Sequence, residues 1–524
     1  MSQAMMSLPP VHSKCLVPIS NLMSKELSSI PTWAKENRKP AFIGGGENIP
    51  FTTFGQLKFL WGNVPAYDIL DLERNEGATF DQDINLCFAA SGDLRNLIHT
   101  MKTIPSSYTR MSTAVLNDKE DLVTARNVIL LLMSVMVVSE DLPEMMLHLW
   151  YSARIPAKLA NILREDITPL VATVVQKIQS RDETTVQAKT WLKGTVSLRV
   201  CLLKHQWEFI LKTLTTELTL VGSESNRKAV VLHDTRIDYR ERHDLNLSPP
   251  LRSCAHKLRV TGVLLPFGSC DQRFNMPNPT LFDANTGEWL QKDSAAALDG
   301  YHLRSIIDFG QKEVPKSDIN GCLYLYSISA LCQFLSRIRK TPMRFIILGT
   351  NALLLAAQLV GHDTIKEGFD RIEVANIADS NYVGLQPVLS TLGPLLKRPV
   401  DNPQATLITL FMNATHLAEW DLGDTYKLST LEKTLSRVKR FLPYKPSSNE
   451  YDPGVIRFKS AEGMFKDRDM LFNHWMKATN VEKIVAQTIM KMRNGNKVTK
   501  KWLYKAPGLK RSLTSCFTRA LMVM

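Results

Sequence analysis

The sequence lacks the short motifs that mark the common catalytic and metal sites. No two cysteines share a Cys-x-x-Cys spacing, and no P-loop, Gly-x-Ser-x-Gly elbow or His-Glu-x-x-His motif occurs. His12 and Cys15 form an isolated pair, and two ligands cannot complete a tetrahedral zinc site. We therefore expect no metal site, and a catalytic role has to be judged from other features.

Long apolar runs and a secretory signal are missing as well. The longest apolar run covers residues 128–138, whereas a membrane-spanning helix needs about 20 residues, so a buried helix is expected there. Residues 1–13 do not combine a basic leading region with an apolar core, which argues against a signal peptide. The eight cysteines lie far apart, mostly in apolar runs, as free thiols do in a reducing compartment. We expect a cytoplasmic protein without membrane insertion.

Acidic residues are absent from one part of the chain. From Lys483 to the C-terminus the sequence has ten Lys and Arg residues and no Asp or Glu, against a net charge of +13 for the whole chain. Residues 441–524 are therefore predicted to form a basic, helical C-terminal tail that could bind polyanions. Trp475, Trp502 and Tyr504 in this tail are also consistent with a docked helix.

Composition divides the rest of the chain. Residues 1–45 are rich in Met, Ser and Pro and end near a triple glycine, which predicts a flexible N-terminal segment. The hydrophobic content of 44% suffices for a large core. Residues 46–440 are assigned to one Rossmann-like domain with a helical insertion at about 142–310.

Two strand–helix units carry the fold prediction. Residues 84–90 form a short continuous apolar run, typical of a strand covered on both faces, and are followed by Ser91-Gly92-Asp93 and a helical pattern. A second apolar segment, residues 111–116, ends at Asn117-Asp118, and a helix over 121–138 follows. Successive units of this kind imply a parallel sheet.

Later segments repeat the alternation of strand and helix. Strands are predicted at 344–348, 369–377 and 405–412, and their order with the intervening helices is similar to the later half of class I methyltransferases. The predicted fold is therefore α/β, with a Rossmann-like (class I methyltransferase-like), mostly parallel sheet. Further helices are expected at 323–338, 352–360 and 385–396.

The predicted insertion has three parts. Residues 142–220 are expected to be helical, with Trp150, Trp191 and Trp207 on apolar faces. A helix capped by the Ser248 hydroxyl, with Pro249 in its first position, should end at Gly262. Residues 266–300, rich in Pro, Gly, Asn and Asp, are expected to form a long ordered loop.

The candidate ligand site lies where the first two strands end. In Rossmann-type folds a glycine turn after the first strand lets the backbone approach a cofactor, and an acidic residue after the second binds ribose hydroxyls. Ser91, Gly92, Asp93 and Asp118 have these places. Only one glycine stands where a dinucleotide fingerprint has three, so a turn and helix caps are the competing interpretation.

Nearby charged residues are interpreted as structural. Arg95 and Arg126 are expected to pair with the carboxylates of the candidate site. The charged cluster from Arg236 to His243 is expected to be a solvated face or a salt-bridged loop.

Several of these stretches together resemble a known family. The strings SGDLRN (91–96) and LNDKEDLVTARN (116–127), together with LWGNVPAYDILDL (60–72) and FDRIEVANIADSNYVGL (369–385), look like the uncharacterised domain of fungal MYND-finger proteins. A distant version of that domain forms the N-terminal part of axonemal dynein preassembly factors. The resemblance covers roughly residues 40–420. It implies a Rossmann-like fold without an established activity, and the zinc ligands of a MYND finger are absent apart from the pair at 12 and 15.

Three functions follow from these features. The first is a non-catalytic interaction or assembly protein with unidentified protein partners and no cofactor. The second is a methyltransferase that binds S-adenosylmethionine at the Gly92 turn, with Asp118 holding the ribose. The third, nucleic-acid binding through the basic tail, has the least support.

Overall fold

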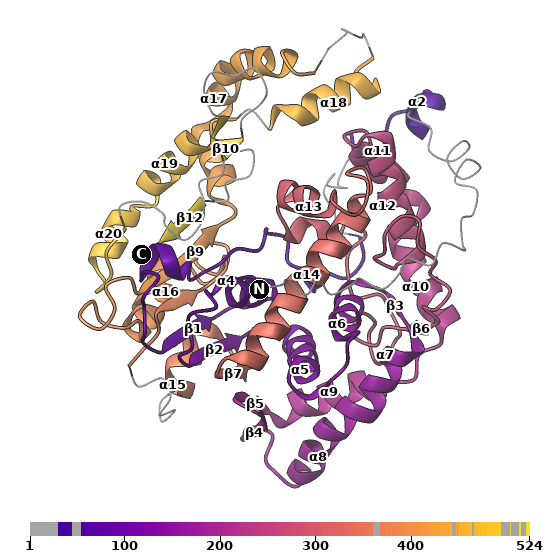
Figure 1. Ribbon diagram of the computed structural model, residues 1–524. Coiled ribbons are helices and arrows are strands. Elements are labelled where there is room, and N and C mark those ends of the chain that lie inside the picture. The colour runs from indigo at the N-terminus through magenta and orange to yellow at the C-terminus, as the bar shows by residue number, and fades with distance from the viewer. Residues whose placement is uncertain are drawn as a thin grey trace.

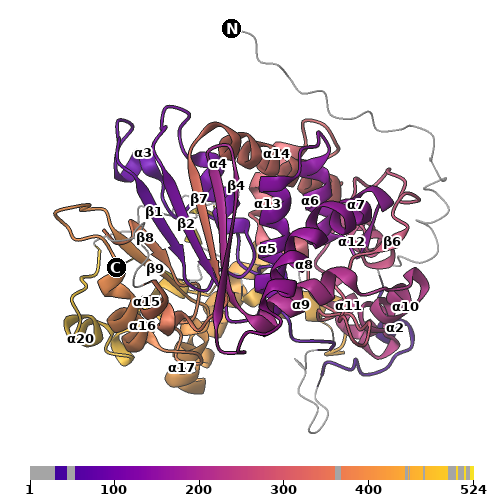
Figure 2. The same cartoon turned by 90° about the horizontal axis from the view of Figure 1, so that it is seen from below.

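The fold is an α/β architecture around one mostly parallel sheet (Figures 1 and 2). The computed structural model describes residues 30–43, 54–359, 367–442, 447, 449–463, 466–493, 503–504, 513–514 and 520–523. Every structural statement below refers to these residues.

The central sheet has eight strands in the order β12-β9-β8-β1-β2-β7-β5-β4. The six strands from β9 to β5 run parallel, and β12 and β4 add to the two edges in antiparallel orientation. The strands are β1 (Ile84–Phe88), β2 (Ser112–Asn117), β4 (Val186–Lys193), β5 (Val196–Leu203), β7 (Met343–Leu348), β8 (Arg371–Glu373), β9 (Thr406–Phe411) and β12 (Ala520–Val523). All five predicted strands are confirmed as members of this one sheet.

Alternating side chains of the sheet enter two separate cores. Leu86 and Phe88 of β1 pack into the larger core, whereas Cys87 between them packs into the second core on the opposite face. A strand buried on both faces needs apolar residues at successive positions, which explains the apolar residues from Leu86 to Phe88.

The larger core covers one face of the sheet with the helices α4 (Arg95–Thr103), α5 (Asp121–Met136), α6 (Leu142–Tyr151), α8 (Thr168–Ile178), α9 (Lys204–Thr215) and α14 (Ile319–Lys340). The second core covers the other face with α15 (Leu355–Leu359), α16 (Leu385–Leu392), α17 (Ala414–Lys439), α19 (Arg468–Ala478) and α20 (Val481–Ala486). Helix α5, predicted from the longest apolar run, is buried along almost its whole length.

The remaining elements are shorter or more peripheral. They are α2 (Thr32–Lys35), α3 (Leu72–Asn75), α7 (Ala157–Ile162), α10 (Leu220–Val231), α11 (Ile237–Asp244), α12 (Pro249–Thr261), α13 (Leu303–Gly310) and α18 (Pro453–Glu462), with two-stranded pairs β3 (Arg154–Ile155) with β6 (Met276–Pro277) and β10 (Leu503–Tyr504) with β11 (Leu513–Thr514). Most of residues 266–300 form the long loop that the sequence predicts.

One part of the predicted insertion differs in secondary structure. The sequence analysis expected helices throughout 142–220, but β4 and β5 form an antiparallel hairpin that extends the sheet next to β7. Trp191 is buried on β4, whereas Trp150 and Trp207 lie on helices as expected. The overlooked signal is the alternation of apolar and polar residues in VSLRV (196–200), which is the period of a strand.

Other differences concern element ends. Strand β8 is shorter than the predicted 369–377, because Ala375 has a φ of 47°, a left-handed conformation that an extended strand does not allow. Helix α12 starts at Pro249 and ends at Gly262 as predicted, but the Ser248 hydroxyl makes no capping hydrogen bond. The charged cluster expected as a solvated face or loop contains the helix α11.

Candidate functional site

The Gly92 turn joins β1 to α4 at the carboxyl edge of the sheet. Gly92 has a φ of 54°, a conformation that glycine adopts without steric cost. A Cβ atom at this position would have no neighbour within 4 Å. The Ser91 backbone N–H donates to the Asn117 carbonyl over 2.8 Å, and the Asn127 side-chain amide donates to the Gly92 carbonyl over 2.7 Å. These two hydrogen bonds therefore fix the backbone of the turn, and the described residues leave the space at the Cβ position of Gly92 free.

Asp118 lies against this turn, so the two strand ends do meet as their positions in the sequence suggested. One carboxylate oxygen accepts from the Gly92 backbone N–H over 2.9 Å, and the other accepts from the Glu120 backbone N–H over 3.0 Å. Burial raises the pKa of Asp118, and these two N–H donors oppose the rise. In this arrangement Asp118 holds the turn and the start of the following helix.

Asp93 has a buried ion pair with Arg95. The Arg95 Nε lies 2.7 and 2.8 Å from the two Asp93 carboxylate oxygens, and the Gly62 backbone N–H donates to the same carboxylate over 2.9 Å. The Arg95 guanidinium also donates to the carbonyls of Val64 and Gly300. The expected pairing of Arg95 is confirmed, and it joins three segments that are distant in sequence.

Two glycines make room for this guanidinium. A Cβ atom on Gly62 would lie 1.2 Å from the Arg95 Nη2, and one on Gly300 would lie 2.6 Å from its Nη1. Arg95, Trp150 and Tyr301 also line a cavity of about 10 Å³, which has room for about one water molecule. The segment that starts at residue 60 thus packs tightly beside the candidate turn.

Arg126 behaves differently from the expectation. Its guanidinium is buried, but it donates to the carbonyls of Thr280 and Trp150 over 2.9 and 2.8 Å, with no carboxylate among its hydrogen-bond acceptors. The expected pairing with the candidate carboxylates is wrong for this residue. Carbonyl oxygens at the ends of other elements provide acceptors that the sequence cannot indicate.

A further acid lies where the strand order reverses. Glu373 ends β8, which pairs with β1 on the side opposite β2. The Tyr67 hydroxyl donates to the Glu373 carboxyl over 3.1 Å, and the Ala375 backbone N–H donates to it over 2.9 Å. Burial raises the pKa of Glu373 to about 7, with these donors opposing it. Sequence reasoning missed Glu373, although an acid within an apolar strand is a signal for a buried carboxyl group.

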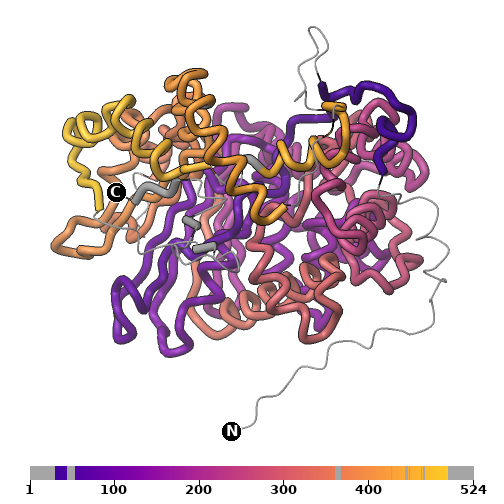
Figure 3. The backbone as a smooth tube through the Cα atoms, turned by 90° about the horizontal axis from the view of Figure 1, so that it is seen from above, coloured from indigo at the N-terminus to yellow at the C-terminus, as the bar shows by residue number. Residues whose placement is uncertain are grey.

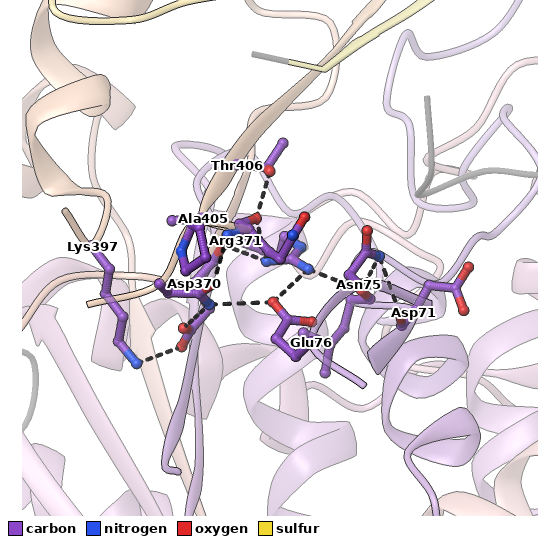
Figure 4. Close-up of polar contacts among 12 residues, drawn as sticks. Asp71, Asn75, Glu76, Asp370, Arg371, Lys397, Ala405 and Thr406 are labelled. Atoms are coloured by element: carbon purple, nitrogen blue, oxygen red, sulfur yellow. Dashed lines mark hydrogen bonds and ion pairs between the residues drawn. The ribbon is translucent and has the colours of Figure 1, made fainter. Parts of the chain in front are cut away.

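Charged side chains also gather at the opposite, amino edge of the sheet (Figure 4). Arg371 and Glu76 form an ion pair of 2.8 Å, and Lys397 and Asp370 form one of 2.9 Å, with all four side chains at most 4% exposed. The Asn402 side-chain amide donates to Asp370 over 2.7 Å. This network ties the segment after α3 to β8 and to the loop before β9, so its role is structural.

A Ser–His–Glu chain of contacts occurs in α6 and just after it. His148 Nδ1 lies 3.0 Å from Ser152 Oγ, and His148 Nε2 lies 3.4 Å from Glu144. Ser152 and His148 have no exposed surface, and the Ser152 hydroxyl accepts from the Leu264 backbone N–H. A nucleophile has to reach its substrate, so these residues serve packing and hydrogen bonding.

The predicted tail lies only partly in the described region. Lys483, Lys491 and Arg493 are described, and the other seven basic residues of the tail lie outside the described residues. Trp475 of α19 packs against Phe411 with ring centroids 4.6 Å apart, so for Trp475 the docked-helix interpretation is confirmed. The pair His12 and Cys15 also lies outside the described residues.

Residues 60–155 match the family described as a domain of unknown function (DUF4470). The matched segment contains β1, the Gly92 turn, Asp118 and α6. No curated protein and no solved structure matches the chain. None of the described helices combines the length and apolar character that a membrane crossing requires. In the part of the chain that the structure describes, no three His, Cys, Asp or Glu side chains converge as ligands for a metal ion.

Proposed function

We propose that this chain is a non-catalytic interaction or assembly protein built on a Rossmann-like scaffold. The observation that carries the proposal is the state of the carboxylates at the carboxyl edge of the sheet. Asp93 is bound by Arg95 and the Gly62 backbone, and Asp118 by two backbone N–H groups. A cofactor would have to compete with these intramolecular donors.

The strand order supports the Rossmann-like part of the proposal. Around β1 the order places β2 and then β7 on one side, and β8 and then β9 on the other. Numbered along the parallel strands outside the β4–β5 hairpin, this order is 3-2-1-4-5, as in doubly wound folds. The antiparallel β12 beside β9 fits the class I methyltransferase-like variant that the sequence suggested.

Three further observations support an interaction role in the cytoplasm. The resemblance to the domain of fungal MYND-finger proteins and of dynein preassembly factors connects the chain with a domain that has no established activity. Cys87, Cys201, Cys254 and Cys322 are free thiols in the described structure, which suits a reducing compartment. Trp420 on α17 is 77% exposed, and exposed aromatic side chains are enriched at protein interfaces.

The second candidate is an S-adenosylmethionine-dependent methyltransferase, with Ser91, Gly92, Asp93 and Asp118 as the cofactor-binding residues. The observation in its favour is the open space above Gly92, where a Cβ atom would have no neighbour within 4 Å. Glycine turns of this kind let the protein backbone approach a cofactor closely.

A calorimetric titration of the full chain with S-adenosylmethionine separates the two candidates. The scaffold proposal expects no saturable binding, and it expects Gly92→Ala to lower the melting temperature because of the positive φ. Saturable micromolar binding would overturn it if Asp118→Asn weakened that binding by about tenfold while the fold was retained. Asp182→Asn, in an exposed loop, is the matched control and should leave any affinity unchanged.

A further inference from the structure

Residues 30–43, which composition assigned to a flexible segment, form a small core of their own with two distant parts of the chain. Trp33, Phe42 and Ile456 are buried together, with Tyr239 and Tyr451 packed beside them. This cluster shares no residue with the two large cores. Figure 3 shows the C-terminal helices reaching across the molecule to this N-terminal segment. The segment therefore connects α11 of the insertion with the start of α18.

Polar contacts fix the segment to α11. The Arg38 guanidinium donates two hydrogen bonds to the Asp238 carboxylate, over 2.7 and 2.8 Å, and the Ala41 backbone N–H donates to the same carboxylate over 2.7 Å. The Thr32 backbone N–H and hydroxyl donate to the two oxygens of Glu241, over 2.7 and 2.5 Å. The Asp238 side chain is 2% exposed, so it depends on these donors to balance its charge.

A hydrogen bond of Trp33 connects the same segment to the chain just before α18, and aromatic contacts hold the cluster together. The Trp33 indole N–H donates to the Tyr451 carbonyl over 3.1 Å, and the Trp33 ring meets Phe42 edge to face at 5.3 Å. The Arg242 guanidinium lies 4.8 Å from the centre of the Phe42 ring. Buried aromatic anchors and a two-point arginine–carboxylate pair are the contacts that dominate peptide recognition between separate proteins.

We propose that residues 30–43 are an intramolecular peptide ligand for a docking site on α11, and that this ligand holds the start of α18 against the insertion. The site recognises a tryptophan, an arginine five residues later and a phenylalanine four residues after that. The proposal goes beyond the scaffold function and does not depend on it. The occupant is the segment of the same chain, so a peptide with the same three side chains should compete with it.

The test is hydrogen exchange of the full-length Arg38→Ala variant, followed in α18 (453–462). Loss of a charge-assisted pair should accelerate exchange there by about tenfold or more, while β1 (84–88) stays protected. Trp33→Ala should act in the same direction. Arg398→Ala removes an exposed two-point pair with Asp401 elsewhere, and it is the matched control that should leave α18 unchanged.

Addition of a synthetic peptide of residues 30–43 distinguishes a ligand from an ordinary structural segment. Excess peptide should restore protection of α18 in the Arg38→Ala variant, whereas the same peptide carrying Arg38→Ala should not. Unchanged exchange in both variants, or a peptide without effect, would overturn the proposal. Protection of the wild type that depends on protein concentration would overturn it too, because the segment would then come from a second copy of the chain.

Discussion

The Arg95 guanidinium and the Asp93 carboxylate form a buried ion pair in which Arg95 Nε lies 2.7 and 2.8 Å from the two oxygens of Asp93. Because the same guanidinium donates to the carbonyls of Val64 and Gly300, the pair fastens two loops to the start of α4. Removing either partner would leave an uncompensated charge in a buried site.

Gly62→Ala tests how much this arrangement contributes to stability. The new Cβ atom would lie 1.2 Å from the Arg95 Nη2, so the guanidinium has to leave its hydrogen-bond acceptors. We expect the free energy of unfolding to fall by about 3 kcal/mol, measured by urea denaturation. Gly268→Ala is the control, because its Cβ meets no atom within 4 Å and its φ is not positive. Equal stabilities of the two variants would contradict the expectation.

Glu373→Gln should change how stability depends on pH. Burial raises the pKa of Glu373 to about 7 from the ordinary 4.5. Between these values the folded protein keeps a proton that the unfolded chain has lost, so the free energy of unfolding falls as pH rises through this window and levels off above it. Glutamine does not titrate, and it can still accept the hydrogen bonds of Tyr67 and Ala375.

Urea denaturation at pH 4.5 and pH 8 measures this effect. The stability of Glu373→Gln relative to the wild type should increase by up to about 3 kcal/mol between the two pH values. Glu432→Gln, on the exposed surface of α17, is the control, and its stability should differ from that of the wild type by the same amount at both pH values. A pH-independent difference for Glu373→Gln would count against a raised pKa.

The amino-edge network offers a double-mutant cycle. Arg371→Met leaves the buried carboxylate of Glu76 without its partner at 2.8 Å, at an expected cost of about 3–5 kcal/mol. Addition of Glu76→Gln should recover part of this loss, because it removes the uncompensated charge. Additive effects of the two substitutions in urea denaturation would show that the pair is not coupled.

The basic C-terminal region predicts salt-sensitive binding to polyanions. Replacement of Lys497, Lys500 and Lys501 by glutamine should lower the salt concentration at which the protein elutes from heparin, because fewer counterions are released on binding.

The matched control for the tail removes the same charge elsewhere. Lys119, Lys177 and Lys316 are exposed in the described structure, and their replacement by glutamine should leave the heparin elution nearly unchanged. Equal shifts for the two triple variants would place the polyanion-binding surface outside the tail.

The sequence predicts five of the six parallel strands because their signal is local. The run from Ile84 to Phe88 is apolar at every position except Asn85, and this pattern indicates a strand covered on both faces. The meeting of Gly92 and Asp118 also follows locally, since each ends one of two adjacent parallel strands. Both the apolar run of β1 and the contact between Gly92 and Asp118 can be inferred from residues within or next to β1 and β2.

The remaining features depend on partners that the sequence does not reveal. Tyr67 and Glu373 are 306 residues apart, and nothing near either residue indicates the other. In the sequence, Asp238 is one of several charged residues in a polar stretch. Only the structure shows that it lies beside Arg38, which is 200 residues away. Asp93, a cofactor-binding candidate in the sequence, likewise proves to be paired with Arg95. Gly62 and Gly300, both distant in sequence, provide the space for the Arg95 guanidinium.

The strand order has a consequence for how the chain is made. The Asn85 backbone N–H, near the start of β1, donates to the Asp370 carboxylate beside β8, which is 285 residues later in the chain. At a synthesis rate of about 5–20 residues per second, the ribosome needs roughly 15–60 s to produce this partner. During that time β1 has its β8 side unpaired, and such edges aggregate readily. Nascent chains that stop before residue 370 should therefore need a chaperone to remain in solution.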